Sequence, residues 1–317
     1  MRVLLLGADG FIGRRVTDRL LADPDLQVTV LGRRDTADIR FDLATGSPGA
    51  LARFLDAVMP RVIINCAGAI HGSPCTLARS NTVAVATVCE AVRRSRDPAR
   101  LVHLGSAAEY GSAPRGTPIL ETAEPRPTGP YGVTKLAGTE LVLSSGLDAT
   151  VLRVFDAVGP GLPAGSVLGR LAEGLRHAME RGDPQVGAAG LSAFRDFVDV
   201  RDVARAVQAA AVSAATGVIN IGGGAAVRVR DAAELLIRAS GFDGRLMEES
   251  HVVPPPALGP APAGAGLQSF AEPRGLPPSV SWRQADVRTA RDRLGWRPRI
   301  PLEESMADIW TEIACRV

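Results

Sequence analysis

A tyrosine and a lysine, Tyr131 and Lys135, stand four residues apart in a chain that is poor in both residue types. Lys135 is the one lysine among 36 lysines and arginines, and Tyr131 is one of 2 tyrosines. Positions i and i+4 share a helix face, so the phenol and the ammonium can meet around one ligand. A neighbouring ammonium stabilises phenolate and lowers a tyrosine pKa from about 10. The spacing predicts an acid–base pair in which Tyr131 moves the proton and Lys135 tunes it.

A serine follows the apolar run Leu101–Gly105, which we expect to form a strand. In a parallel sheet the carboxyl ends of the strands face the ligand crevice. Ser106 stands at such an end and can donate a hydrogen bond to a reacting carbonyl. We therefore place Ser106 beside Tyr131 and Lys135 as the third catalytic residue.

A glycine-rich turn joins the first expected strand, Arg2–Leu6, to the helix expected over Phe11–Leu21. Gly7 permits the tight turn, and Gly10 lets the backbone approach a pyrophosphate at the helix N-terminus. Gly13 allows the helix to pack closely on the strand. The turn predicts a dinucleotide site, and Phe11 and Ile12, between the last two glycines, belong to the same segment.

Two arginines, Arg33 and Arg34, end the second expected strand, Gln27–Leu31. NAD-binding proteins usually carry an Asp or Glu there, which accepts hydrogen bonds from the adenosine ribose. Guanidinium groups suit a 2′-phosphate, so the pair favours NADP(H) over NAD(H), which stays possible. Asp35 is a nearby alternative partner for the ribose.

Strand-like and helix-like segments alternate over the first 150 residues, which predicts an α/β fold. We expect a Rossmann-type doubly wound parallel sheet with a smaller C-terminal substrate-binding domain. The proposed division is residues 1–155 for the NADP-binding domain and 156–317 for the second, with 196–222 returning to the first. Other expected helices are 76–96, Pro130–Ser144, 166–181, 200–213, 230–239, 286–294 and Leu302–Ala314, and other expected strands are 61–65, Ala149–Val154 and Gly217–Ile221. Residues 252–278, rich in Pro, Ala and Gly, are expected to form a long loop, either a surface insertion or a lid.

The composition is that of a soluble globular protein. Hydrophobic residues make up 46% and charged residues 22% of 317 residues, and the net charge is +2. Such a balance gives no electrostatic footprint for nucleic acid or an anionic membrane. No apolar stretch reaches the length of a membrane span, and the N-terminal apolar run is too short for a signal peptide, so we expect a cytoplasmic protein. The 4 cysteines have no metal-ligand spacing, which predicts free thiols and no metal site.

Together these motifs resemble the extended short-chain dehydrogenases/reductases of the NAD(P)-dependent epimerase/dehydratase family, over nearly the whole chain. The resemblance implies an NAD(P)-dependent oxidoreductase that acts on nucleotide sugars and forms a homodimer through two helices. It implies that the Asp42-Leu43 pair contacts adenine. It also implies that Ala67 and Gly68 line the cofactor, with Asn81 on the following helix.

The resemblance also implies residues that bind the substrate. Arg195, in a signature that runs from Arg195 to Val203, would contact the substrate diphosphate. Our own hypothesis adds Arg274, from the Pro-rich stretch, as a second arginine that clamps the diphosphate. The family usually has an asparagine at Asp156, close to the diphosphate, where an ionised carboxylate would repel the phosphates. Asp156 could instead be paired with an arginine and face elsewhere.

Within the family, the segment Gly105–Gly111 and the stretch around Gly159–Gly161 are similar to GDP-6-deoxy-4-keto-mannose reductases. Sugar-nucleotide dehydratases usually carry a glutamate two residues before the tyrosine that matches Tyr110. This chain has Ala108 there, and its glutamate is Glu109. Since elimination of water needs an acid–base carboxylate within reach, a dehydratase is disfavoured.

The leading hypothesis is an NADPH-dependent ketoreductase that reduces a 4-keto-6-deoxy nucleotide sugar, with Tyr131 as the proton donor. One alternative is a nucleotide-sugar 4-epimerase that retains NAD and returns the hydride. Another, motivated by Asp156, is a ketoreductase for a non-nucleotide natural-product ketone. A protein that only senses the cofactor would need no proton donor, so the Ser106, Tyr131 and Lys135 set argues against it. The sugar, the nucleotide and the stereochemistry stay open.

Overall fold

The computed structural model describes residues 1–249 and 281–315, and seven of their strands form one parallel sheet. Its strands are β1 (Arg2–Leu6), β2 (Gln27–Gly32), β3 (Ile39–Arg40), β4 (Val62–Asn65), β5 (Arg100–Ser106), β6 (Ala149–Val154) and β10 (Gly217–Ile221). The order across the sheet is β10-β6-β5-β4-β1-β2-β3, and every pairing is parallel. The order reverses beside β1, which places the ligand crevice outside the carboxyl ends of β1 and β4. The predicted Rossmann-type fold is confirmed.

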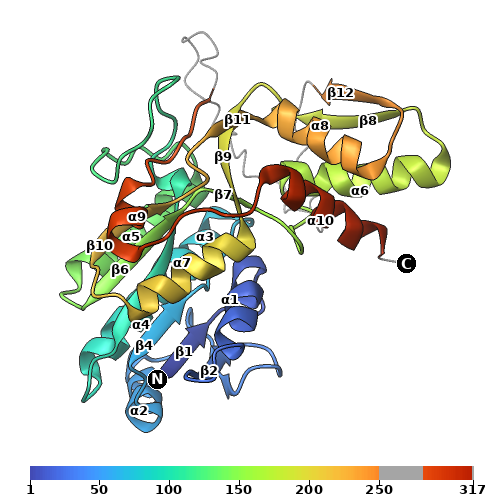
Figure 1. Cartoon of the computed structure of the whole chain (residues 1–317). Coiled ribbons are helices and arrows are strands. Elements are labelled where there is room, and N and C mark those ends of the chain that lie inside the picture. Colours follow the sequence, from blue (N-terminus) through green and yellow to red (C-terminus); the bar gives the residue numbers. More distant parts are fainter. Residues whose placement is uncertain (250–280, 316–317) are drawn as a thin grey trace, which may run out of the picture.

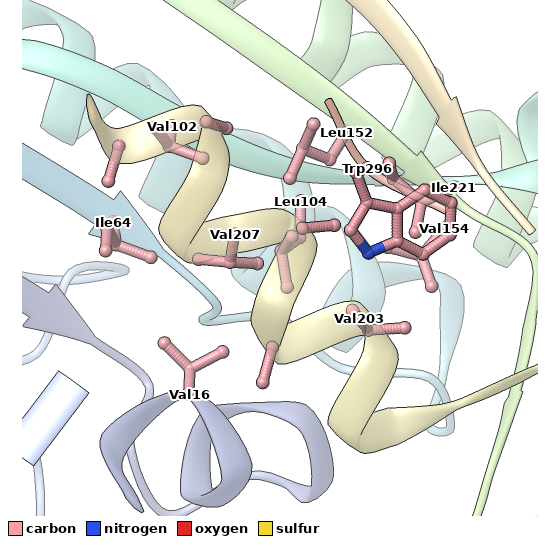
Figure 2. Close-up of a cluster of buried hydrophobic side chains, with 14 of the residues drawn as sticks. Val16, Ile64, Val102, Leu104, Leu152, Val154, Val203, Val207, Ile221 and Trp296 are labelled. Atoms are coloured by element: carbon pink, nitrogen blue, oxygen red, sulfur yellow. The ribbon is translucent and has the colours of Figure 1, made fainter. Parts of the chain in front are cut away.

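One face of the sheet is covered by α1 (Phe11–Leu21), α7 (Val200–Val212) and α9 (Arg288–Leu294). Figure 2 shows Val203 and Val207 of α7 directed at Leu104 and Leu152 of the sheet, with the Trp296 ring beside them. These side chains are at most 6% exposed, which explains why the central strands are continuous apolar runs.

The opposite face is covered by α2 (Pro48–Val58), α4 (Ala84–Arg94) and α5 (Pro130–Ser144). The helix expected over residues 76–96 consists of α3 (Pro74–Ala78), a π-helical turn η1 (Arg79–Val83) and α4. A π turn inserts one extra residue per turn and often marks a functional site. It carries Asn81 into the interior.

The remaining elements form a C-terminal lobe beyond the carboxyl edge of the main sheet (Figure 1). They include three strands in one small sheet and two in another, β7 (Asp156–Val158), β9 (Phe194–Asp199) and β11 (Ala226–Arg228), then β8 (Gln185–Ala189) and β12 (Arg245–Glu249). The helices are α6 (Val167–Arg181), α8 (Val229–Ser240) and α10 (Leu302–Ala314). Their apolar faces share a separate core, in which Leu171, Leu236 and Met306 are fully buried. The lobe thus overhangs the ligand crevice.

The chain returns from the lobe to the main sheet, because β10 pairs with β6. The later helix α9 and Trp296 also pack on the main sheet. Residues 252–278, which we expected to form a loop, and Arg274 within them lie outside the described residues. In the described ranges no helix has the length and apolar character of a membrane span, and no three His, Cys, Asp or Glu side chains are grouped as metal ligands.

Candidate active site

The glycine-rich turn between β1 and α1 leaves no room for side chains at two of its glycines. Gly7 has φ of +79°, and a Cβ there would lie 2.5 Å from the Ala67 nitrogen. A Cβ on Gly13 would lie 2.0 Å from the Gly7 carbonyl oxygen. Gly7 thus lets β1 and β4 approach, and Gly13 lets α1 begin directly against the turn.

The N-terminus of α1 opens on a cleft of about 280 Å³. Gly10 is the N-cap and offers no side chain to the first-turn amides, so these donors are free for an anion. Phe11 packs against the lobe core and Ile12 against the main-sheet core, and neither residue lines the cleft. The Gly10 amide donates to the Gly7 carbonyl over 3.2 Å, and a Cβ on Gly10 would lie 3.4 Å from that oxygen, its nearest neighbour. The cradle fits a dinucleotide pyrophosphate.

Both arginines at the end of β2 line this cleft and are exposed. Nε of Arg34 lies 3.9 Å from Oδ2 of Asp9, a residue of the glycine-rich turn. The Thr36 hydroxyl donates to the other Asp9 oxygen over 3.1 Å. Arg33 and Arg34 therefore stand where a 2′-phosphate on the adenosine ribose could accept their hydrogen bonds.

Of the other residues expected to bind the cofactor, four line the cleft and one does not. Asp42, Leu43, Ala67 and Gly68 line the cleft. Asn81 is 1% exposed and does not line it. Its amide group exchanges two hydrogen bonds with the Ala69 backbone and donates a third to the Thr134 hydroxyl of α5. Asn81 therefore fixes the loop that lines the cleft instead of facing it.

Ser106 ends β5 and begins a short 3₁₀ turn, η2 (Ala107–Glu109), with a capping box. Its hydroxyl accepts from the Ala108 amide over 3.2 Å, and its own amide donates to Oε1 of Glu109 over 2.7 Å. The Tyr131 phenol, from the start of α5, lies close enough to this hydroxyl for the serine to influence its pKa. The structure thus brings Ser106 and Tyr131 together at the carboxyl end of β5.

The pKa of Tyr131 differs from the sequence-based expectation. We expected Lys135 to lower it, but burial raises the pKa of the phenol above its ordinary value. The nearby Ser106 hydroxyl acts in the opposite direction, and the Glu109 and Asp156 charges raise the pKa further. Lys135 is not among the leading influences on the phenol. The expected sign is wrong because desolvation of a phenolate outweighs its favourable contacts here.

Lys135 lies one turn of α5 beyond Tyr131 and is 6% exposed. Its ammonium donates to the Leu104 carbonyl of β5. Burial lowers its pKa, and the charge of Glu109 partly restores it. An ammonium has three donors, so two remain for a ligand beside the cleft.

The structure reveals an arginine that the sequence analysis missed. Arg195 of β9 and Arg283 both lie near Asp156, with Arg195 Nε 4.0 Å and Arg283 Nη2 3.9 Å from Asp156 Oδ1. Arg283 reaches this place because Trp282 forms a bridge to Phe194 at the start of β9. No local pattern marks that pairing. Asp156 was expected either to lie at the diphosphate or to pair with an arginine. The structure shows the second arrangement, with two arginines near the carboxylate.

Sequence comparison gives the family. Residues 3–222 match the NAD dependent epimerase/dehydratase family. A dTDP-6-deoxy-L-talose 4-dehydrogenase (NAD(P)(+)) of Kitasatospora kifunensis is 38% identical over 98% of this chain and 95% of its own length. A GDP-6-deoxy-D-mannose reductase of Pseudomonas aeruginosa is 25% identical over 100% of this chain and 98% of its own.

Solved structures show the same fold. RMD from Pseudomonas aeruginosa complexed with NADPH superposes with a TM-score of 0.80 at 22% identity, covering 100% of this chain and 99% of its own. MoeE5 in complex with UDP-glucose and NAD superposes with a TM-score of 0.77 at 28% identity and covers 98% of both chains. The chain therefore belongs to the NAD dependent epimerase/dehydratase family of extended short-chain dehydrogenases/reductases and is an NAD(P)-dependent enzyme.

Proposed function

We propose that this enzyme reduces the C4 ketone of a 4-keto-6-deoxy nucleotide sugar with NADPH. The observation that carries the proposal is the proximity of the Ser106 and Tyr131 side chains at the carboxyl end of β5, where Lys135 binds the Leu104 carbonyl. Support for the substrate comes from the 38% identical relative, whose name specifies a 4-dehydrogenase of a dTDP-6-deoxy sugar. Thymidine diphosphate is therefore the first nucleotide to test.

The dinucleotide would lie along the glycine cradle, with its pyrophosphate on the α1 amides and its ribose near Lys135. When bound, NADPH supplies the hydride. Tyr131 gives its phenolic proton to the carbonyl oxygen as negative charge develops there. The Ser106 hydroxyl orients that oxygen by donating to it. The Lys135 ammonium donates to the nicotinamide ribose and so positions the nicotinamide beside Tyr131. One hydride and one proton convert the ketone into a secondary alcohol.

Glu109, the glutamate next to the position where dehydratases carry theirs, does not face the sugar. Glu109 is 0% exposed, and both of its oxygens are engaged, one with the Ser106 amide and one with Arg153. A buried carboxylate held this way cannot reach a sugar carbon. This supports reduction in preference to dehydration.

The test is to mix the purified enzyme with NADPH and a dTDP-4-keto-6-deoxy hexose and follow the nicotinamide absorbance. Oxidation of NADPH, with the 4-hydroxy sugar as product, is expected. Tyr131→Phe should reduce turnover by about 100-fold or more while NADPH still binds. The GDP-linked ketone, run in parallel, tests the nucleotide.

Two results would redirect the proposal. NAD retained through purification, with interconversion of 4-epimers and no net oxidation, would establish a 4-epimerase. Turnover of a ketone that carries no nucleotide, with none of the nucleotide sugars, would remove the substrate class but leave the reductase.

A further inference from the structure

Asp156, Arg195 and Arg283 form a group at the carboxyl edge of the main sheet, here called the carboxylate–arginine cluster. Ser106 pairs in register with Val154, and Asp156 follows Val154 by two residues. Two extended residues span about 7 Å, so the cluster lies beside the serine and next to the reacting carbonyl. The charges of Asp156 and Arg283 also influence Tyr131, which agrees with this placement.

The two arginines stand near the Asp156 carboxylate without forming direct hydrogen bonds to it. Their nitrogens are 4.0 and 3.9 Å from Oδ1, beyond the range of a hydrogen bond. The Nη1 group of Arg195 donates instead to the backbone oxygens of Phe194 and Ser281. The arginines thus offset the charge of Asp156 and leave its acceptor sites available.

The second carboxylate oxygen, Oδ2, is buried and accepts no hydrogen bond from any residue in the described ranges. Burying such an oxygen costs free energy, because the acceptor loses its hydrogen bonds to water and forms none with the protein. Phosphate oxygens are acceptors and would be repelled by it, whereas a sugar hydroxyl can donate to it. The ligand that fits Oδ2 is therefore a hydroxyl group.

We propose that Asp156 recognises the sugar hydroxyl adjacent to the reacting ketone, at C3, and that Arg283 is a positioning residue that makes this carboxylate tolerable beside a diphosphate. The proposal rests on the proposed function for the identity of the reacting ketone. The cluster carries two positive charges and one negative charge, so it remains attractive to an anionic substrate. It selects a hydroxylated sugar over its 3-deoxy analogue.

The first experiment compares the 3-hydroxy and 3-deoxy forms of the same 4-keto-6-deoxy nucleotide sugar with the wild-type enzyme and Asp156→Ala. A hydrogen bond to a charged acceptor predicts a loss in kcat/KM of about 10- to 100-fold on the 3-hydroxy sugar. The variant should lose the preference for the 3-hydroxy sugar, so that its kcat/KM values for the two sugars agree within about 2-fold, because no carboxylate is left to bind the hydroxyl. Equal losses on both sugars would overturn the proposal. Asp156→Asn, which keeps the side-chain shape, gives the same comparison if the alanine variant is unstable.

The second experiment tests the role of Arg283. Arg283→Met should raise the KM for the 3-hydroxy sugar about 10-fold with a smaller change in kcat. Arg283→Lys, which keeps the positive charge, should bring the KM most of the way back to the wild-type value. In an Asp156→Ala background, Arg283→Met should have a smaller effect, because there is no carboxylate left to offset. If the effects of Asp156→Ala and Arg283→Met were additive, the role proposed for Arg283 would be overturned. Arg288→Met is the matched control, since Arg288 lies five residues further on and is bound to Asp286 at the surface.

A failure of the proposed function is separable from a failure of this inference. If the wild-type enzyme oxidised no NADPH with either sugar, the proposed reaction would be refuted. Calorimetric titration with the two nucleotide sugars would still decide the inference, which expects Asp156→Ala to abolish the preference for the 3-hydroxy form. No difference in binding between the two sugars in the wild type would refute it.

Discussion

Glu109 and Arg153 form a buried ion pair directly behind the serine of the active site. Nε of Arg153 lies 2.6 Å from Oε2 of Glu109, and the side chains are 2% and 0% exposed. The other Glu109 oxygen accepts from the Ser106 amide, so the pair connects β6 to the end of β5. The Arg153 guanidinium also lies over the Tyr110 ring, 4.4 Å from its centroid. The buried Glu109 carboxylate, which does not line the cleft, therefore holds Ser106 in place.

The ion pair gives a prediction for pH dependence. Burial first, then the Glu109 charge, raise the pKa of Tyr131. Reduction needs the protonated phenol, so the rate should be lost as pH rises through that pKa. Glu109→Gln removes the charge and keeps one of the two acceptor oxygens, and the alkaline limb of kcat/KM should move to lower pH. An unchanged alkaline limb with a lower overall rate would mean that Glu109 acts only as a support.

The same pair should matter for stability. Glu109→Ala leaves the buried Arg153 guanidinium without its partner, and the free energy of unfolding should fall by about 3–5 kcal/mol. Glu109→Gln should lose less, because it retains an acceptor for the arginine. Urea denaturation of the two variants checks the order. A smaller loss for the alanine variant would contradict the role assigned to the pair.

Lys135 is predicted to contribute to catalysis without contributing to stability. Its ammonium is buried, and the lowered pKa shows that burial disfavours the charged form. Lys135→Met keeps the apolar stem and loses one hydrogen bond to Leu104. The free energy of unfolding should change by no more than about 1 kcal/mol, and turnover should fall by about 100-fold or more. A large loss of stability would show that the lysine holds α5 on β5.

Local patterns predict the elements well where amphipathic periodicity and turn residues agree. The helices Phe11–Leu21, Pro130–Ser144 and Leu302–Ala314 have the bounds expected from the sequence. The small strands of the lobe were not expected. β8 reads Gln-Val-Gly-Ala-Ala and pairs with β12, far along the chain. Such strands form because of tertiary pairing and not because of their own sequence.

In the candidate site, too, local features could be predicted from the sequence and long-range contacts could not. Glycines and the Tyr131–Lys135 spacing can be recognised from residue types, because their chemistry is local. Arg283 could not be recognised, since a bridge between Trp282 and Phe194 brings it to Asp156. Asn81 could be found but not given its role, because its amide is used entirely by Ala69 and Thr134. Long-range contacts decide which polar residues face the ligand.

Alanine substitutions at two glycines of the turn are predicted to have different effects, one on stability and the other on NADPH binding. Gly13→Ala places a methyl group 2.0 Å from the Gly7 carbonyl oxygen, so the free energy of unfolding should fall by about 1–3 kcal/mol. Gly10→Ala meets its nearest neighbour at 3.4 Å and should fold with a loss within about 1 kcal/mol. Its methyl group would stand in the path of the pyrophosphate, so NADPH should bind about 10-fold more weakly. Denaturation and fluorescence titration separate the two effects. Normal NADPH affinity in Gly10→Ala would place the pyrophosphate elsewhere.

The enzyme is predicted to prefer NADPH over NADH, and this preference should depend on Arg33 and Arg34. Both are exposed and line the cleft, so neither should be needed for folding. Each charge-assisted hydrogen bond to a 2′-phosphate is worth about 1.5–3 kcal/mol, so Arg33→Ala should raise the KM for NADPH about 10-fold or more. The KM for NADH, which lacks that phosphate, should change little. Arg40→Ala is the control, because Arg40 is exposed nearby and paired with Asp35. Equal changes for both cofactors in Arg33→Ala and Arg34→Ala would show that these arginines do not contact the 2′-phosphate, and the enzyme would then be expected to use NADH as well as NADPH.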